Sequence, residues 1–542
     1  MINQDIICSN KFTGGQLIAL SGTSGHTDFD NGLVLRTGFD GKSINIVYPQ
    51  KLEIKFDFEI KDSFIGSDWV ILQSKKKSHK LVFINAFTVA LQGDWTIESI
   101  NQYKLAEKNG IQIISQREID DSIFNFEIDK LISFNQKFLQ SKKENITRWK
   151  QNQDCVNKAL IQINTMICSP EGRINSYWST PDRWPHRKMW LWDSVFHAAG
   201  IRHIDIKIAK SILSSVFDCQ NESTGFIPHM MTPHENSNIT QPPVLALGIK
   251  LILEKEGYSR KSISWMNTFY HRLEKYLDWV FDNRDTDGDG LVEWFIEENE
   301  ECRSGESGMD NSVRFDEAIT LAAVDFNAFL SNEYGIMGKF ASLLGKDDEA
   351  KIWLEKKNKL DKLINSCLWD SKKKFYFDFN FKNNKISPVK SVAGFLPIFS
   401  ETACSEQIDY LVEELNNPET FGVEFPIPSI SIDNDNYDTD MWRGPTWVNM
   451  NWIIGKSLLS TKHREKGLDI IKKTIEIIEN NFDSFGTFFE YYDCKNKIDP
   501  PSLKRKKRCD PERSPYHQVF FDYGWTACLY VDMINIIQEI ER

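Results

Sequence analysis

The chain has 542 residues, 41% hydrophobic and 26% charged, a composition typical of a globular protein too long for one ordinary core. Its formal net charge of −12 argues against a nucleic-acid partner, because phosphate binding needs clustered Lys and Arg on one face. No apolar run approaches the ~20 residues that span a bilayer, and the start shows no secretory signal, so we expect a cytoplasmic protein without a membrane partner.

Residues 1–130 have the alternating pattern of a β domain. From Leu52 to Ile60, apolar and charged side chains alternate, which is the period of a half-buried strand. Turn residues such as Gly41 and Gly66 separate similar segments. We therefore predict an antiparallel β-sandwich over residues 1–130, with strands at 32–36, 43–48, 52–60, 69–73, 81–91, 111–115 and 123–128.

Helical periodicity begins near residue 129. Residues 347–369, for example, place Trp353, Leu360 and Leu368 near one face and charges elsewhere. After a helical linker at 131–150, we predict a mainly α domain over residues 151–542, built as a toroid of paired helices. The periodicity is equally compatible with a helical solenoid. Further helices are expected at 318–344, 407–415, 447–459 and 467–478.

Polar and aromatic side chains gather in loops between these helices. Flat aromatic faces stack on sugar rings and carboxylates bind their hydroxyls, so this composition favours a carbohydrate site. Taken singly, each segment is also typical of a capped turn, a surface ion pair or a packed aromatic turn. The segments are Trp184–Phe196, Thr240–Pro243, Glu306–Asp316, Trp442–Trp447, Gly486–Tyr492 and Tyr523–Ala527.

Two of these segments carry candidate catalytic carboxyls. Hydrolysis of a glycosidic bond needs one protonated carboxyl at the leaving oxygen and one carboxylate across the sugar ring. Asp310 and Glu490 are the candidates for these two roles. Because they lie far apart in the sequence, only a closed fold can bring them together.

The segment Glu306-Ser-Gly-Met-Asp-Asn-Ser-Val-Arg314 resembles glycoside hydrolase family 63 and its relatives, the mannosylglycerate and glucosylglycerate hydrolases. Family members carry Glu-Ser-Gly-Met-Asp-Asn-Ser-Pro-Arg, so this chain differs only at Val313. The resemblance runs from about residue 150 to the C-terminus and implies an (α/α)6 barrel and an inverting mechanism. It assigns the general acid to Asp310 and the general base to Glu490.

The same resemblance assigns supporting roles around one sugar-binding pocket. Trp192 and Asp193 resemble its aromatic wall and its hydroxyl-binding carboxylate, and Trp525 would close it from the C-terminal side. The other substrate-binding assignments are Gln241, Asn311, Arg314, Trp442, Arg443 and Trp447.

One stretch departs from the relatives. They usually follow Glu-Tyr-Tyr with an Asn-Pro-x-Thr-Gly turn, but here Asp493–Lys497 follows, and then a polar stretch at 498–518. This stretch holds the basic run Lys504–Arg508. We expect a solvated loop. The alternative is a lid over the leaving-group side, where Lys and Arg would meet an acidic group.

Asp285, Asp287 and Asp289 match the opening of a calcium loop, but Ile296 occupies the twelfth position, where a bidentate Glu is expected. An Asp-rich turn is the simpler interpretation, although some family members bind calcium nearby, so a structural Ca²⁺ remains an alternative. The sequence shows no cluster of His or Cys for a catalytic metal, and we expect no required cofactor.

The sequence therefore predicts an inverting exo-acting α-glycosidase, an α-glucosidase or α-mannosidase, that acts on a small oligosaccharide or glycoside. Two alternatives remain: a glycoside phosphorylase on the same barrel, and a carbohydrate-binding protein without activity. No residue identity decides between glucose and mannose, and linkage, leaving group and oligomeric state are likewise open.

Overall fold

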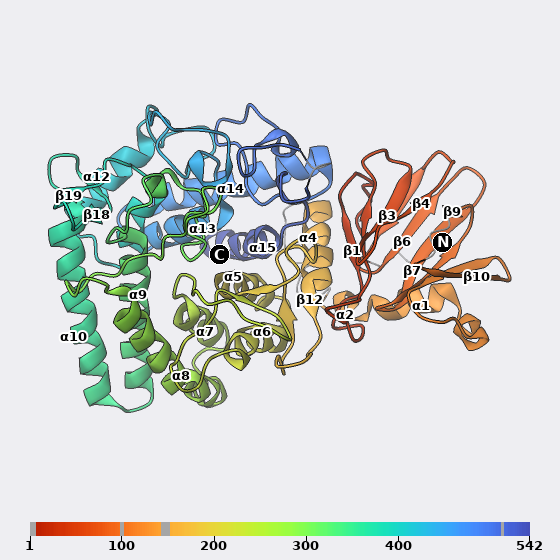
Figure 1. Ribbon diagram of the computed structural model, residues 1–542, viewed down its shortest axis with the longest axis horizontal. Helices are drawn as coiled ribbons and strands as arrows, with labels where there is room; N and C mark the ends of the chain where they lie inside the picture. Colours follow the sequence, from red (N-terminus) through yellow and green to blue (C-terminus); the bar gives the residue numbers. More distant parts are fainter. Residues whose placement is uncertain (1–6, 98–101, 143–151, 511–513) are drawn as a thin grey trace.

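The computed structural model describes residues 7–97, 102–142, 152–510 and 514–542. A β-rich N-terminal region lies beside a larger helical domain, which confirms the predicted mainly α chain with a β region at its start (Figure 1). Residues 143–150 of the predicted linker and 511–513 of the basic stretch lie outside the described residues. Among the described helices, none has the length and apolarity needed to cross a bilayer.

The β region consists of two antiparallel sheets. Apolar side chains from both sheets, among them Leu35, Ile54, Leu72 and Phe83, form one shared core, so the sheets pack face to face as a sandwich. In spatial order the five-stranded sheet is β1 (Leu17–Ala19), β2 (Val34–Thr37), β3 (Ser43–Tyr48), β4 (Leu52–Lys55) and β9 (Thr96–Ile97). The six-stranded sheet is β10 (Lys104–Lys108), β11 (Ile111–Ser115), β8 (Thr88–Gln92), β7 (Ser78–Asn85), β6 (Trp69–Gln73) and β5 (Asp62–Ile65).

Three predicted strands differ from the structure. The strand expected at 52–60 ends at Lys55, and the one expected at 81–91 is the hairpin of β7 and β8. Residues 123–128 form no strand: Asp120 accepts a hydrogen bond from the Ser122 amide and caps a short 3₁₀ helix, and α1 (Ile128–Asn135) follows. Their alternating apolar side chains cover the outer face of the six-stranded sheet, where Ile128 packs near Trp69.

The helical domain is built around a ring of six helices, each in contact with the next. The order around the ring is α15, α5, α7, α9, α11 and α13, which contacts α15 again. Outer helices pack on this ring, α4 on α15, α6 on α5, α8 on α7, α10 on α9 and α14 on α13. The helices are α4 (Gln153–Met166), α5 (Leu191–Ile201), α6 (Ile206–Asp218), α7 (Leu245–Lys255), α8 (Arg260–Arg284), α9 (Val324–Leu343), α10 (Asp347–Leu363), α11 (Leu396–Phe399), α12 (Ser405–Asn416), α13 (Val448–Leu458), α14 (Arg464–Phe485) and α15 (Gly524–Ile540), with the short α2 (Lys137–Gln140) before them.

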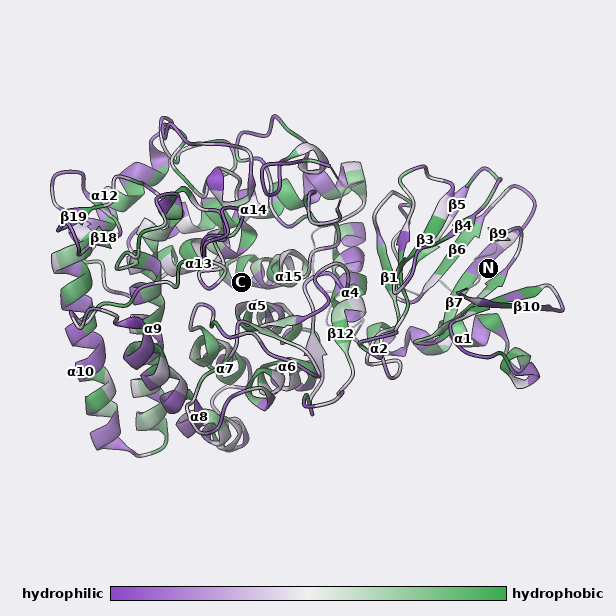
Figure 2. Cartoon of the chain, in the orientation of Figure 1, coloured by the Kyte–Doolittle hydropathy of each residue, from purple (hydrophilic) through white to green (hydrophobic). Residues whose placement is uncertain are grey.

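Inner and outer helices of this domain differ in hydropathy. The inner helices α5 and α7 are largely hydrophobic, whereas the outer helix α10 is mostly hydrophilic (Figure 2) and buries only Trp353 and Leu360. Short ribbons decorate the loops: β12 (Ile167–Cys168) with β13 (Trp178–Ser179), β14 (Met189–Trp190) with β15 (Met230–Met231), β16 (Trp369–Asp370) with β17 (Phe375–Tyr376), and β18 (Phe379–Asn380) with β19 (Lys385–Ile386).

Candidate active site

A cavity of about 480 Å³ lies in the helical domain where the polar-aromatic loops meet. Both candidate catalytic residues, Asp310 and Glu490, line it, although they come from distant parts of the sequence. The other predicted residues in its lining are Trp192, Asp193, Gln241, Trp442, Trp447 and Trp525.

Tryptophans build one wall of the cavity. The rings of Trp442 and Trp447 are stacked at 3.9 Å between centroids and an angle of 5°. Trp525 lies edge-on to Trp447 at 5.7 Å and to Trp192 at 5.6 Å. Because each ring is fixed by the next, the wall presents preformed apolar faces of the kind on which a sugar ring stacks.

Several polar atoms beside this wall lack a protein partner. Asp193 Oδ1 and the Nε1 atoms of Trp190 and Trp525 are buried, with no hydrogen-bond partner among the residues that the structure describes. Buried polar groups are rarely left unsatisfied, so an acceptor and two donors in one cavity lining suit the hydroxyls of a ligand. Gln241 fixes the first turn of α5, because its Oε1 accepts a hydrogen bond from the Trp192 amide (3.2 Å).

The loop that carries Asp310 is anchored by Glu306. This buried carboxylate accepts hydrogen bonds from Arg284, at 2.6 and 2.8 Å, and from the amides of Thr240 and Phe295. Gly308 then adopts a left-handed φ of +70°, and a Cβ there would lie 2.3 Å from the Trp192 ring. The motif therefore needs glycine at this position for two reasons, backbone conformation and close approach to the aromatic wall.

Three residues assigned to substrate binding lie outside this lining. Arg314 is buried between Asp325 and Asp378, whose carboxylates it binds at 2.7–2.8 Å. Asn311 Oδ1 accepts from the Trp442 amide at 3.1 Å, and Arg443 pairs with the partly exposed Asp316 at 2.6 Å. These side chains hold the loops behind the cavity wall.

Burial raises the pKa of the Asp310 carboxyl above its ordinary value, while Lys506 and Arg505 act in the opposite direction. A carboxyl with a raised pKa keeps its proton to higher pH, which suits a proton donor. The charge of Arg314, in the same motif, is taken up by Asp325 and Asp378.

Burial also raises the pKa of the Glu490 carboxyl above its ordinary value, while the paired guanidinium of Arg505 acts in the opposite direction. Arg505 Nε lies 3.0 Å from Glu490 Oε2, and its NH2 lies 3.3 Å from Oε1. The arginine is itself fixed: it donates to the Tyr516 carbonyl at 3.0 Å and lies over the Phe520 ring at 4.1 Å. The pair favours an ionised Glu490, which suits a general base.

The expectation of a solvated loop at 498–518 is wrong for Arg505 and Lys506. Lys504, Lys507 and Arg508 are exposed, but Arg505 is 3% exposed and Lys506 lines the cavity. Exposed and buried residues follow one another in this run because the chain turns back on itself, with left-handed φ values at Lys506 and Lys507. The loop therefore closes part of the cavity, as the lid alternative requires.

Several other residues line the cavity but were not predicted as site residues. His186 and Tyr523 lie inside the predicted polar-aromatic loop segments, so their position in the sequence could have identified them. Lys188 has the same origin, whereas Cys302 and His229 stand in no such segment. Burial lowers the pKa of the His186 imidazole well below its ordinary value, which favours the neutral ring.

The Asp-rich turn places ligand atoms of Asp285, Asp287 and Asp289 within 4.8 Å of one another. Loop amides use several of the carboxylate oxygens, for example Gly290 N to Asp285 Oδ2 at 3.1 Å. Asp285 Oδ1 and Glu293 Oε1, however, are buried without a partner in the described part of the chain. An all-oxygen donor set of this kind fits a hard cation such as Ca²⁺.

Comparisons with known proteins agree with this geometry. The family profile described as mannosylglycerate hydrolase MGH1-like glycoside hydrolase domain matches residues 186–497, more than half of the chain. Mannosylglycerate hydrolase MGH1 of Selaginella moellendorffii is 22% identical over 378 residues, covering 56% of this chain and 75% of that protein. The mannosylglycerate hydrolase of Thermus thermophilus is 23% identical over 384 residues, covering 56% and 88%.

A solved structure is also similar. The GH63 mannosylglycerate hydrolase from Thermus thermophilus, in complex with Tris, matches with a TM-score of 0.58 at 20% identity. The match covers 70% of this chain and 99% of that one. It shows a shared fold.

Proposed function

Since this chain belongs to the mannosylglycerate hydrolase MGH1-like glycoside hydrolases, and is therefore an enzyme that hydrolyses glycosidic bonds, we propose that it is an inverting, exo-acting α-glycosidase. The observation that carries the proposal is that Asp310 and Glu490 line one cavity beside a wall of tryptophans. We also infer that the helical domain is an (α/α)6 barrel, which the ring of α5, α7, α9, α11, α13 and α15 with its outer helices supports.

In the proposed mechanism, Asp310 donates its proton to the leaving oxygen while Glu490 takes a proton from the water that attacks the opposite face of the anomeric carbon. Burial raises the pKa of both carboxyls, but the hydrogen bonds from Arg505 go to Glu490, which favours Glu490 as the carboxylate and Asp310 as the acid. Asp193, with its unpartnered Oδ1, would hold a hydroxyl of the cleaved sugar.

For the substrate we propose a small α-glycoside with an acidic leaving group. Lys188 and Lys506 line the cavity together with Arg505, so an anionic group would find cations there. The relatives are called mannosylglycerate hydrolases, which makes α-mannosylglycerate the first compound to test. Their names give no support to a preference for glucose, and the α-glucosyl counterpart is the second compound.

The test is product analysis by proton NMR on these compounds and on neutral aryl α-glycosides. We expect the β-anomer of the released sugar first, with loss of nearly all activity in Asp310→Asn and Glu490→Gln. Release of the α-anomer would overturn the inverting mechanism. Turnover that requires inorganic phosphate and yields a sugar phosphate would instead establish the phosphorylase alternative, for which the cations beside Glu490 offer a phosphate site.

A further inference from the structure

The β-sandwich lies outside the matched family region, yet it contacts the loops that build the cavity. The outer face of β1 and β2 is apolar: Leu17, Ala19 and Val34 form a small cluster against which Trp184 of the helical domain packs. Trp184 stands next to Pro185 and His186, which line the cavity. The family profile begins only at residue 186, beyond the sandwich.

A single arginine on β2 ties three chain segments together. Arg36 NH1 donates to the carbonyls of Gly15, at 2.6 Å, and Phe521, at 3.2 Å. Its NH2 donates to the carbonyls of Asp182, at 3.3 Å, and Trp184, at 2.7 Å. A planar guanidinium carries five donors in a fixed geometry, so it can hold these backbone segments at set distances from one another.

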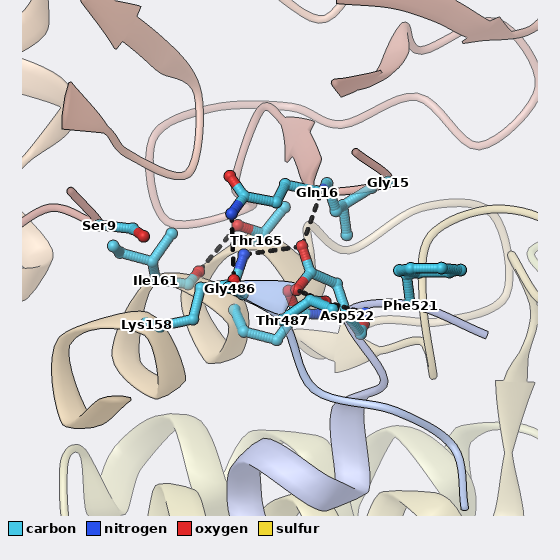
Figure 3. Close-up of polar contacts among 12 residues, drawn as sticks. Ser9, Gly15, Gln16, Lys158, Ile161, Thr165, Gly486, Thr487, Phe521 and Asp522 are labelled. Carbon is cyan, nitrogen blue, oxygen red and sulfur yellow. Dashed lines mark hydrogen bonds and ion pairs between the residues drawn. The ribbon is translucent and has the colours of Figure 1, made fainter. Parts of the chain in front are cut away.

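A buried ion pair continues the contact next to Phe521 (Figure 3). Asp522 Oδ2 accepts from the Leu17 amide of β1 at 2.6 Å and from Lys158 of α4 at 2.7 Å. Its Oδ1 accepts from Thr487 Oγ1 at 2.6 Å. The Asp522 and Lys158 side chains are 0% and 1% exposed, so water does not compete for these bonds.

The same β segment reaches the end of α14. Gln16 Nε2 donates to the Gly486 carbonyl at 3.0 Å, where the helix is capped by a left-handed glycine with φ of +66° (Figure 3). A Cβ at Gly486 would lie 2.8 Å from Gln16 Nε2, so the β-sandwich and this helix cap fit closely. Residue 486 lies four positions before Glu490.

The candidate base, Glu490, lies in one of two neighbouring segments that the β-sandwich contacts. Residues 487–490 and 519–523 run side by side: Glu490 N donates to the Phe520 carbonyl and Tyr523 N to the Phe488 carbonyl, both at 3.1 Å. Glu490 and Tyr523 line the cavity. Any shift of this pair of segments moves the carboxylate relative to Asp310, which is attached to the other side of the domain.

We propose that the N-terminal β-sandwich positions the active site, with Arg36 as the main positioning residue and the Asp522–Lys158 pair beside it. The inference rests on the proposed role of Glu490. Arg36 touches no substrate; it sets the place of the segments that carry Glu490, Tyr523 and His186. The position of the active-site segments therefore depends on the β-sandwich.

The test compares Arg36→Met with Arg36→Lys and with Lys11→Met. Lys11 also crosses between the two domains, but its Nζ donates to the carbonyls of Phe482 and Asp483 in the last turn of α14 and not to residues 487–490 or 519–523. In Arg36→Met we expect kcat to fall about tenfold to a hundredfold with a smaller change in KM, because small misplacements of a catalytic group have effects of that size. Arg36→Lys should recover part of the loss, and Lys11→Met should match the parent enzyme.

Hydrogen exchange gives a readout that does not depend on activity. The amides of Glu490 and Tyr523 should exchange faster in Arg36→Met than in Lys11→Met. If Arg36→Met does not fold, Gln16→Met replaces it; this variant loses the contact with the Gly486 carbonyl together with the bonds from Gln16 Nε2 to Lys11 O and Thr13 Oγ1. Unchanged kcat and exchange in the folded variant would overturn the inference. If Glu490→Gln keeps full activity, the proposed function fails instead, whatever Arg36 does.

Discussion

At the scale of single residues, Arg505 opposes the effect of burial on the Glu490 carboxyl, whose pKa is nevertheless raised above its ordinary value. The carboxyl is buried, which alone would raise its pKa, and the guanidinium at 3.0 Å opposes that rise. A general base must be ionised before it can take a proton, so in the proposed mechanism we expect this pair to set the acidic limit of activity. Arg505 is therefore placed to act through Glu490, which two of its nitrogens contact.

Replacing Arg505 by Met should therefore move the acidic limb of the kcat/KM profile to higher pH. Removal of the cation raises the pKa of Glu490 further, because burial then acts on the carboxyl without an opposing charge. The measurement is the pH dependence of hydrolysis of a neutral aryl glycoside, which avoids any loss of binding to an acidic leaving group. Lys507→Met is the control, since Lys507 is exposed and lies 3.5 Å from the surface residue Glu300. An acidic limb that stays in place in Arg505→Met would contradict the role given to the pair.

The motifs of the sequence predicted both carboxyls and the tryptophans of the cavity, and the basic run at Lys504–Arg508 was an alternative lid, but the sequence did not say which of its cations line the cavity. Asp310 and the tryptophans stand in local patterns whose composition is informative by itself. Arg505 stands in a run of five basic residues, and only the folded turn at Lys506 and Lys507 makes one member buried and its neighbours exposed. Arg314 shows the reverse: it belongs to the motif, but its charge serves two structural carboxylates.

At the scale of elements, the Asp-rich turn between α8 and the Asp310 loop is open to a direct test. Burial raises the pKa of Glu293 to about 7, with Asp287 and Asp289 contributing further. A raised folded-state pKa means that the folded protein binds this proton more tightly than the unfolded chain. Stability is therefore lost as pH rises from the ordinary value of Glu towards 7.

Calcium should restore that stability by replacing the proton. We expect Ca²⁺ at pH 8 to raise Tm and EGTA to reverse the rise, with little effect at pH 5, where Glu293 is protonated in the absence of metal. Differential scanning calorimetry gives the measurement, and Asp287→Asn, which keeps the shape of an exposed ligand, should remove most of the calcium response. Identical Tm values with Ca²⁺ and with EGTA at pH 8 would show that the turn is held by its own amide hydrogen bonds.

The elements themselves were predicted where one periodicity persisted. Helices α12 and α13 lie within two residues of the predicted ranges, and α9, α10 and α14 overlap theirs but differ by six or seven residues at one end; each keeps one apolar face over several turns. Residues 123–128 misled the prediction, since their alternating apolar side chains cover a sheet without being part of it. The hairpin of β7 and β8 was missed because the turn at Ala86 and Phe87 is apolar and lacks the usual turn residues.

At the scale of the whole molecule, the change of period near residue 129 predicted two parts, but nothing in the sequence predicted how closely they join. The apolar outer face of β1 and β2 has the pattern of a strand buried on both faces. That pattern does not say what covers the face. The answer comes from Trp184 and from Asp522, which lies hundreds of residues from its partner amide on Leu17.

This junction predicts that both parts unfold together. Lys158→Met leaves the Asp522 carboxylate buried without its cation, which should lower the free energy of unfolding by about 3–5 kcal/mol. The double variant Lys158→Met with Asp522→Leu should recover part of this loss, because it removes the uncompensated charge together with its partner. Urea unfolding is followed by tryptophan fluorescence and by far-ultraviolet circular dichroism. Since Asp522 also binds the Leu17 amide of β1, we expect one coincident transition that moves as a whole in Lys158→Met. Two separated transitions, of which only one moves, would show that the β-sandwich and the helical domain are stable independently.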